Sequence, residues 1–190
     1  MAVIVQKDDP VLRKTAKAVP EKSIGSREIR SVLERMKKAL DSQKDGVAIA
    51  APQIGESLRI FVVSERALEV PDNIAERRKR PFRGSERPKD LSKHYGHLIF
   101  INPVITKIAK EKTWLEEGCL SIRYLYGKVS RASKASVRAF NERGQLFTRG
   151  ASGLMAQIFQ HEIDHLDGIL FIDKAVDVKE MMPERPNREL

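Results

Sequence analysis

The sequence predicts an α+β fold, with antiparallel strands packed around one buried central helix that carries an H-E-x-x-H motif. Two observations predict this class. Apolar residues recur at helical spacing in two stretches, 26–42 and 152–168. Several shorter segments are apolar or alternate in polarity and end at Asn, Gly or Pro, which is typical of strands and turns.

The bulk composition indicates a single domain. At 190 residues the chain is long enough for a substantial core, and we treat residues 1–190 as one unit. One cysteine excludes an internal disulfide and fits a reducing compartment. The sequence does not begin with an export signal, and it lacks the roughly 20 consecutive apolar residues that cross a bilayer. We therefore expect a cytoplasmic protein without a membrane partner.

The net charge of +9 favours polyanionic surroundings such as ribosomes. The basic residues are scattered, apart from the run at 77–80, and no aromatic RNA-binding signature accompanies them. A solvated surface therefore explains the charge better than a nucleic-acid interface does. Ribosome proximity remains an expectation, and DNA is not expected as a partner.

The N-terminal part begins with a candidate edge strand at residues 2–5 and a turn at 8–13. The helix predicted over 26–42 has charged residues between its apolar ones. A small-residue segment follows at 46–55, where missing side chains let a backbone approach a ligand closely. The next predicted strand is 58–63.

The middle of the chain is less regular. Residues 64–97 are highly charged and lack periodicity, which predicts an insertion or a mobile loop. Strands are predicted on both sides of an Asn-Pro break, at 98–101 and 104–108.

The last third contains strands within 129–140, a hairpin turn at 141–144 and a returning strand at 145–148. After the second helix, 169–172 is predicted as a strand and 175–190 as a polar C-terminal tail.

The second helical stretch contains residues with metal chemistry. His161 and His165 are four residues apart, which places both imidazoles on one helix face, with Glu162 beside them. H-E-x-x-H on a helix is typical of metal hydrolases, in which two histidines bind the metal and the carboxylate moves protons. Ser152 can cap this helix and Gly168 can end it. The alternative is a surface helix with a chance pair of histidines.

A metal site of this type needs a third protein ligand. The extended metalloprotease motif places a histidine six residues after His165, where this chain has Phe171. Glutamates further downstream lie in the polar tail. Cys119 is the strongest candidate. His94 and His97 are the next candidates, although histidines in a polar loop are more often solvated.

Three segments resemble the three motifs of the peptide deformylases. They are Gly46–Gln53, Glu117–Ser121 (E-G-C-L-S) and Gln160–His165 (Q-H-E-I-D-H). Residues Asp9–Arg13 are similar to that family's N-terminal segment. The resemblance covers nearly the whole chain, with 64–97 the least matched part, and the second and third motifs together are highly specific.

The resemblance implies a metal-dependent hydrolase that removes the formyl group from the N-terminal formylmethionine of newly synthesised polypeptides and releases formate. Cys119, His161 and His165 would hold one divalent metal. The family's usual metal is Fe²⁺, and Zn²⁺, Ni²⁺ or Co²⁺ can replace it. Glu162 would act as the proton carrier.

The resemblance also assigns residues around this centre. The Gln53 amide and the Leu120 backbone N–H would stabilise the oxyanion. Glu117 and Arg131 would pair and hold the cysteine segment in place. Four residues would contact the extended substrate peptide: Gly46, Val47, Ala48 and Gly118.

Two positions depart from the usual family pattern. Ala48 stands where the family usually has a second glycine, and Arg123 stands where it often has a proline. We expect the extra methyl group of Ala48 to restrict how the substrate strand approaches. We expect Arg123, with Tyr124 and Tyr126, to change the shape and inhibitor preference of the pocket. Neither substitution replaces an expected metal ligand or the expected proton carrier.

Two other functions fit parts of the sequence. A peptidase of the H-E-x-x-H type would cleave plain peptides, so substrate choice separates it from a deformylase. A binding protein of the same fold, for example a ribosome-associated factor, would have lost catalysis, but the intact ligand set argues against this.

Overall fold

The computed structural model of the protein describes residues 3–69 and 96–182. Most of the predicted insertion at 64–97 lies outside these residues, as does the end of the predicted tail. Two helices lie within them, α1 (Arg27–Asp41) and α3 (Gly153–Leu166). The strands are β1 (Ala48–Ala50), β2 (Ile60–Ser64), β3 (His97–Ile108), β4 (Lys112–Cys119), β5 (Ile122–Ala132), β6 (Lys134–Phe140), β7 (Leu146–Ser152) and β8 (Val176–Glu180).

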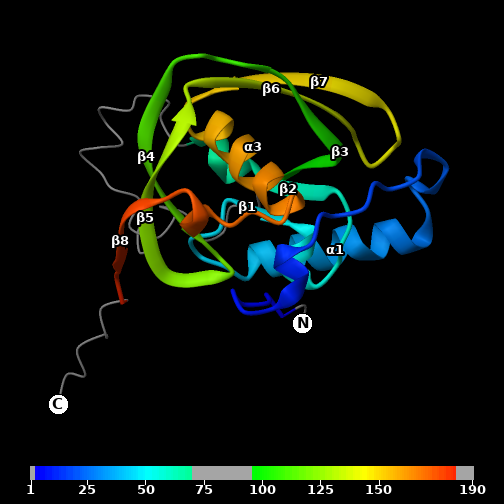
Figure 1. The fold of residues 1–190 in the computed structure, drawn as a ribbon. Coiled ribbons are helices and arrows are strands. Elements are labelled where there is room, and N and C mark those ends of the chain that lie inside the picture. The colour runs from blue at the N-terminus through cyan, green and yellow to red at the C-terminus, as the bar shows by residue number, and fades with distance from the viewer. Residues whose placement is uncertain (1–2, 70–95, 183–190) are drawn as a thin grey trace.

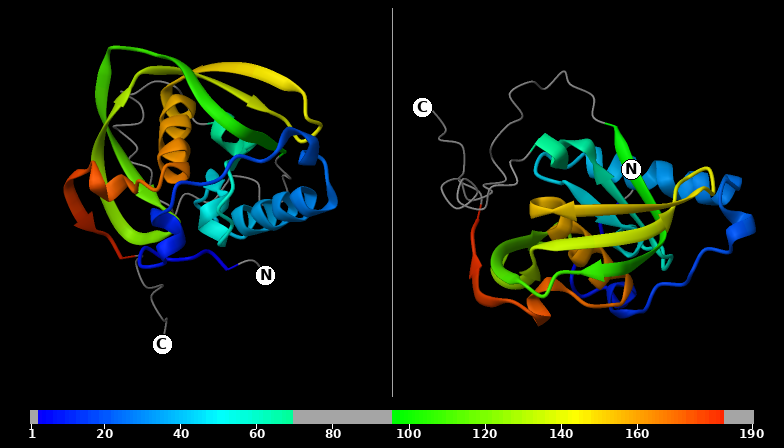
Figure 2. Two further views of the ribbon diagram at one scale, coloured as in Figure 1. Left: turned by 45° about the vertical axis from the view of Figure 1, so that its right-hand side comes forward. Right: turned by 90° about the horizontal axis from the view of Figure 1, so that it is seen from above.

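The strands form two antiparallel sheets. One has the order β1-β2-β3-β6-β7 and the other the order β4-β5-β8. Helix α3 contacts strands of both sheets, whereas α1 packs beside β1 and β2 (Figures 1 and 2). Antiparallel sheets with two helices confirm the α+β class. No helix among the described residues combines the length and apolar character needed to span a membrane.

Strand β2 is buried on both faces, which explains its continuous apolar sequence. Successive side chains of a strand point to opposite faces of the sheet. Phe61 therefore packs in the cluster around α3, where its ring stacks 4.5 Å from that of Phe100. Ile60 and Val62 pack in the cluster around α1. This two-sided core fixes β1, next to β2, between the two helices.

Helix α1 confirms the prediction made from its periodicity. It begins after Ser26, whose hydroxyl accepts a hydrogen bond from the Ile29 N–H at 3.3 Å. Its buried residues share one face: Ile29, Val32, Leu33, Met36, Ala39 and Leu40. The hairpin turn is also confirmed, with Gly144 at φ +73° between β6 and β7.

Three local expectations were wrong. Residues 3–5 form no strand. The two strands expected around the Asn-Pro break are one strand, β3, because Asn102 adopts φ +51° and its side chain makes two hydrogen bonds to the Val19 backbone. The strand expected at 169–172 is replaced by a 3₁₀ helix, Phe171–Asp173, in which the Asp173 carboxylate accepts a hydrogen bond from the Leu170 N–H.

The C-terminal segment also differs from the expected tail. Val176–Glu180 form β8, which pairs with β5. All five side chains of β8 are exposed, so its place in the sheet depends mainly on backbone hydrogen bonds. Composition alone does not reveal such a strand.

Substitution of Gly168 tests how the end of α3 is held in place. It has φ +76°, and a Cβ added there would lie 2.7 Å from the Arg13 carbonyl oxygen. Gly55 is a matched control, because it has φ +83° but no atom within 4 Å of an added Cβ. We expect Gly55→Ala to lower the free energy of unfolding by roughly 1–2 kcal/mol. Gly168→Ala should cost about 1 kcal/mol more because the backbone must also move.

Urea titration of the two variants measures this difference. Equal losses would show that the Arg13 backbone does not constrain the end of α3.

Candidate metal centre

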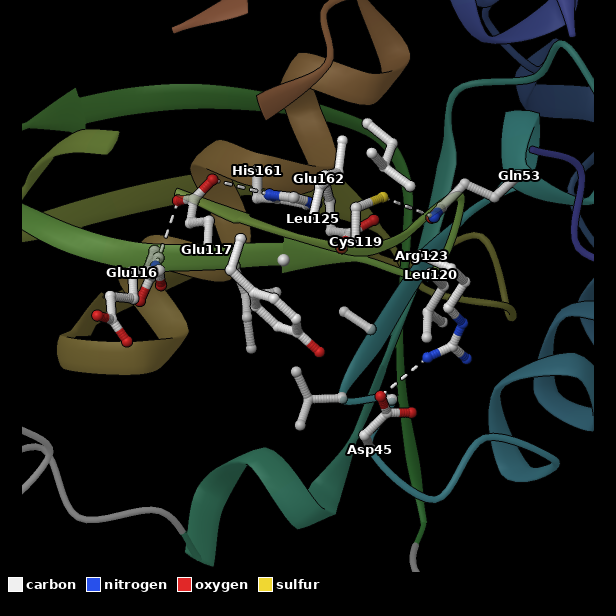
Figure 3. Close-up of a pocket in the computed structure, with 18 of the residues that line it drawn as sticks. Asp45, Gln53, Glu116, Glu117, Cys119, Leu120, Arg123, Leu125, His161 and Glu162 are labelled. Carbon is white, nitrogen blue, oxygen red and sulfur yellow. Dashed lines mark hydrogen bonds and ion pairs between the residues drawn. The ribbon is translucent and has the colours of Figure 1, made fainter. Parts of the chain in front are cut away.

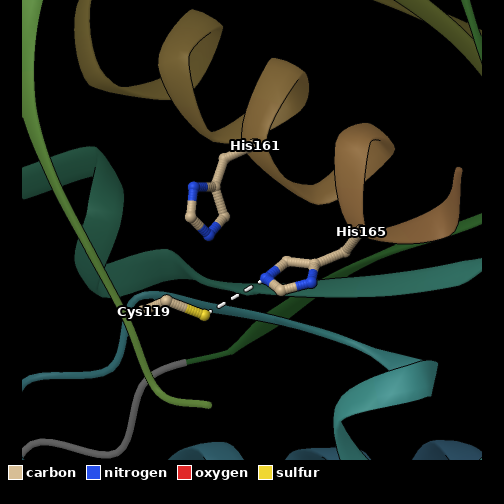
Figure 4. A group of neighbouring side chains, drawn as sticks. All are labelled: Cys119, His161 and His165. Atoms are coloured by element: carbon tan, nitrogen blue, oxygen red, sulfur yellow. Dashed lines mark hydrogen bonds between the residues drawn. The ribbon is translucent and has the colours of Figure 1, made fainter. Parts of the chain in front are cut away.

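Helix α3 positions two imidazoles over one pocket. The His161 and His165 rings have centroids 5.0 Å apart. His161 Nδ1 lies 3.0 Å from a carboxylate oxygen of Glu117, which leaves its Nε2 on the side of Cys119 and His165 (Figure 4). The helix ends directly after His165, where Gly168 takes the left-handed conformation expected from the sequence.

Cys119 reaches the same point from the end of β4. The β4–β5 register shifts between Gly118 and Cys119, at the tight turn that joins the two strands. The thiol sulfur lies 3.2 Å from His165 Nε2. It also accepts hydrogen bonds of 3.4 Å from the Ser121 N–H and from the Gln53 side-chain amide. Two N–H donors and two imidazoles therefore surround the sulfur.

The three side chains fit a divalent metal. One ligand atom from each of Cys119, His161 and His165 lies within 4.8 Å of the others. Within the described part of the chain, no other group of three such residues is found. One thiolate and two imidazoles suit Fe²⁺, Co²⁺, Ni²⁺ and Zn²⁺, and three protein ligands leave a coordination position open for chemistry.

The charges and hydrogen bonds around Cys119 favour its thiolate form, which is the form that binds metals. Burial raises the pKa of the Cys119 thiol, but the charges and hydrogen bonds of His165 and His161 outweigh burial and lower it to about 5. Burial acts to lower the pKa of His161, yet its hydrogen bonds to Cys119 and Glu117 raise it well above the usual value. The thiol is therefore ready to bind a cation as thiolate.

A buried ion pair between Arg131 and Glu117 holds His161 at its Nδ1 atom. Arg131 donates two hydrogen bonds to the Glu117 carboxylate, at 2.8 and 2.9 Å, and both side chains are at most 4% exposed. The expected pairing of these two residues is confirmed. Burial acts to raise the pKa of Glu117, but the hydrogen bonds from His161 and Arg131 lower it to about 2. Glu117 therefore remains an acceptor that orients the His161 ring.

Two partners of this pair were not identified from the sequence. Arg131 also donates to the Asp164 carboxylate at 2.6 Å, and Lys174 donates to the same carboxylate at 2.7 Å. Asp164 lies three residues after His161, on the adjoining helix face. This spacing could have indicated that Asp164 lies near the ion pair. Lys174 lies beyond the helix, and no local pattern marks it.

Glu162 lies in the pocket beside the ligand group. Its side chain is almost completely buried, and within the described residues its Oε2 atom has no hydrogen-bond partner. Burial raises the pKa of this carboxyl to about 7, against the opposing charges of the histidines. A buried carboxylate oxygen without a partner, next to three side chains that could hold a metal ion, suits a residue that exchanges protons with a water or a substrate.

The pocket also contains the other residues singled out from the sequence (Figure 3). Its walls include Gln53, Leu120 and the four residues expected to contact substrate, Gly46, Val47, Ala48 and Gly118. Gly118 is required by packing, because an added Cβ would lie 2.7 Å from the Tyr126 ring. The Tyr126 ring therefore occupies the space beside Gly118 that a side chain would fill.

The alternative third ligands do not join this group. His97 lies at the start of β3 and contacts the Asp41 carboxylate at 2.9 Å, at the end of α1. His94 lies outside the described residues.

Fold and pocket together define a metal-hydrolase type of site, and comparison with known proteins identifies the family. The model of the polypeptide deformylase family matches residues 1–181. The chain is 39% identical over 174 residues to the peptide deformylase of Halothermothrix orenii, covering 92% of this chain and 93% of that one. It is 35% identical to peptide deformylase 1A, chloroplastic/mitochondrial, of Arabidopsis thaliana, of which it spans 61%.

The fold is also similar to solved structures. The crystal structure of the peptide deformylase from Thermotoga maritima superposes with a TM-score of 0.71 at 33% identity, covering 93% of this chain and 98% of that chain. The chain therefore belongs to the peptide deformylase family. Members of this family are metal-dependent enzymes that remove N-formyl groups from nascent peptides.

The Glu117–Arg131 pair predicts a non-additive effect on stability. Glu117→Gln leaves the buried Arg131 with fewer compensating charges and should cost about 3 kcal/mol, as breaking a buried ion pair typically does. Arg131→Met should cost a similar amount because it leaves the Glu117 carboxylate buried with less compensation. The double variant should lose less than the sum of the two.

Urea unfolding of the chelator-treated protein measures these losses without a contribution from bound metal. Strictly additive losses would show that the two side chains do not depend on each other.

Proposed function

We propose that this chain is a peptide deformylase that hydrolyses the N-formyl group of formylmethionyl nascent peptides and releases formate. One observation carries the proposal. Cys119, His161 and His165 converge on a buried pocket in which Glu162 has an unpartnered carboxylate oxygen. The H-E-x-x-H motif on α3, the helix that contacts both sheets, acts in this proposal as the metal-binding element.

Cys119, His161 and His165 would hold one divalent metal. When bound, this metal supplies Lewis acidity, which lowers the pKa of a water and polarises the formyl carbonyl. The mixed thiolate and imidazole ligands suit Fe²⁺, Zn²⁺, Ni²⁺ and Co²⁺. We propose Fe²⁺ as the working metal because it is the usual metal of the family, with the other three as substitutes. The Glu117 carboxylate fixes the His161 ring so that Nε2 is the ligand atom.

Glu162 is the proton carrier in this mechanism. Its carboxylate takes a proton from the attacking water and later gives it to the departing amine of methionine. The amine leaves as the free N-terminus of the peptide, and formate is the second product. The position of Glu162, adjacent in sequence to His161 and inside the pocket, supports the role.

Gln53 and Leu120 would stabilise the oxyanion that forms on the formyl carbonyl. The Gln53 side-chain oxygen accepts a hydrogen bond from the Ala50 N–H at 2.8 Å, which directs its NH₂ group toward Cys119. The Leu120 backbone N–H follows directly after Cys119. Donors held in place before the reaction are worth more than donors that must reorient during it.

The free edge of β1 would receive the peptide. β1 is an end strand of its sheet, and the residues before it, Gly46 and Val47, line the pocket with Ala48. A nascent chain is extended and can add to such an edge through backbone hydrogen bonds. Gly118, on β4, also lines the pocket.

The substrates place the proposed activity close to translation. Formylmethionyl chains arise at ribosomes, so we propose a cytoplasmic enzyme that acts near them. Bacterial relatives of similar length support this part of the proposal.

A single assay tests the function. Purified protein is incubated with formyl-Met-Ala-Ser and with acetyl-Met-Ala-Ser, and formate is measured enzymatically while metal is quantified in the same preparation. We expect formate from the first peptide, in proportion to bound metal, and no cleavage of the second. A metal-loaded protein that cuts internal peptide bonds and releases no formate would instead be a peptidase.

Glu162→Gln tests the proton carrier. The substitution keeps the size of the side chain and all three metal ligands, so fold and metal content should be unchanged. General acid–base catalysis typically contributes about 10²–10⁴-fold, and kcat should fall by that factor. A kcat within a few-fold of the parent value would remove Glu162 from the mechanism.

Cys119→Ser tests the third ligand. A hydroxyl is a much poorer ligand than a thiolate, so the variant should retain little metal after dialysis against a weak chelator. His97→Ala is the control and should keep the parent's metal content. The reverse pattern would transfer the ligand role from Cys119 to His97.

A further inference from the structure

The pocket lining contains an ion pair that the catalytic mechanism does not use. Arg123, at the start of β5, donates a hydrogen bond of 2.9 Å to the Asp45 carboxylate and a second one to the Gln43 side-chain oxygen. Both charged side chains are partly buried, at 29% and 20% exposed, and both line the pocket. Figure 3 shows the Arg123 guanidinium pointing toward the Asp45 carboxylate. The pair therefore bridges two walls that are far apart in sequence.

The segment held by Arg123 leads directly into the proposed peptide-binding edge. Residues 42–47 connect α1 to β1 without regular structure. Arg66 supports this segment on another side, donating to the Lys44 carbonyl at 3.0 Å. The Val47 carbonyl is held by the Ser64 N–H at 2.9 Å. Arg123 supplies side-chain contacts to the same segment from β5, the strand that follows the cysteine turn.

The neighbouring backbone indicates that Arg123 is held in a constrained position. Tyr124 has φ +67°, a conformation that is uncommon and costly for a bulky residue. Its carbonyl accepts a hydrogen bond from the Met181 N–H at 2.8 Å, which anchors the residue to the segment after β8. The contacts of Arg123 with Asp45 and Gln43, called the brace below, therefore start from a backbone that is constrained directly after Arg123.

We propose that Arg123, acting through Asp45 and Gln43, is a positioning residue that fixes the β1 edge for the incoming formylated peptide. This inference rests on the proposed function. Because the brace orders the binding edge before substrate arrives, its loss should weaken peptide binding, as lost preorganisation does. Within the described residues, the hydrogen bonds of Arg123 that form the brace go to Asp45 and Gln43, and not to Glu162 or a proposed metal ligand. Turnover of bound peptide should therefore change little.

Steady-state kinetics on metal-loaded protein test the brace. Arg123→Ala and Asp45→Ala should each raise KM for formyl-Met-Ala-Ser by about 3- to 10-fold, the range for losing the net contribution of one ordinary hydrogen bond. The kcat should stay within about twofold. The double variant should be no worse than the poorer single variant, because both changes remove one interaction. Reversing the pair, with Arg123→Asp and Asp45→Arg together, should recover part of the loss.

Two variants serve as controls. Arg35→Ala removes another ion pair, that between Arg35 and Glu56, which does not line the pocket, and KM should not change. Arg123→Lys keeps the charge but reaches a single acceptor at a time, so its KM should be intermediate. Metal content and thermal midpoint should match the parent in every variant that is compared.

The outcomes separate this inference from the proposed function. A parent protein that releases no formate contradicts the function, and calorimetric affinity for the product Met-Ala-Ser then reports on the brace by itself. With an active parent, unchanged KM in Arg123→Ala overturns the brace. A raised KM in Arg123→Ala but not in Asp45→Ala also overturns it, because Arg123 would then contact the peptide directly.

Discussion

The buried contact between Arg131, Glu117 and His161 is the interaction on which the site depends. It joins β5, β4 and α3 at one point, because each residue comes from a different element. Three charged or polar side chains in the interior are costly unless each is paired. Here each carboxylate oxygen of Glu117 receives a donor from Arg131, and one also contacts His161. The position of the imidazole therefore follows from the packing of both sheets against the helix.

Gln160 adds a second link between the same elements. Its buried amide makes hydrogen bonds to both the N–H and the carbonyl of Ala132, at the end of β5. The side chain thus takes the place of a neighbouring strand and fixes the distance between α3 and β5. A shift of α3 along its axis would break these bonds together with the contact between Glu117 and His161. Both links bring His161 and His165 toward Cys119 with little freedom.

The five-stranded sheet fixes the position of the other wall of the pocket. Helix α1 covers one face and α3 covers the other, so β1 is buried on both faces and its edge faces the pocket. Gln53 follows β1 in a short 3₁₀ helix and reaches across to the thiol. The small residues of this stretch are therefore explained by close packing as well as by access for a ligand.

Features with a local cause were predictable from the sequence. The periodicity of α1, the four-residue spacing of the histidines and the glycine at the end of α3 each act within a few residues. Features with a distant cause were not. The continuity of β3 depends on Asn102 reaching Val19, 83 residues away along the chain. Strand β8 has exposed side chains, so its sequence resembles a polar tail.

The site shows the same division between local and distant causes. The H-E-x-x-H helix and Cys119 carry recognisable chemistry in the sequence. Asp164 and Lys174 complete the ion-pair network, but they resemble ordinary charged residues until the fold brings them to Arg131. Arg123 was visible as a departure from the family pattern, and its contact with Asp45 became apparent only in the structure.

Anomalous diffraction from a crystal of the metal-loaded protein, recorded at the absorption edge of the bound metal, tests the central claim most directly. The account predicts one strong peak, within bonding distance of Cys119 Sγ, His161 Nε2 and His165 Nε2, with Glu117 still bound to His161 Nδ1. A strong peak at any other group of side chains, or a Cys119 thiol turned away from the two histidines, would contradict it.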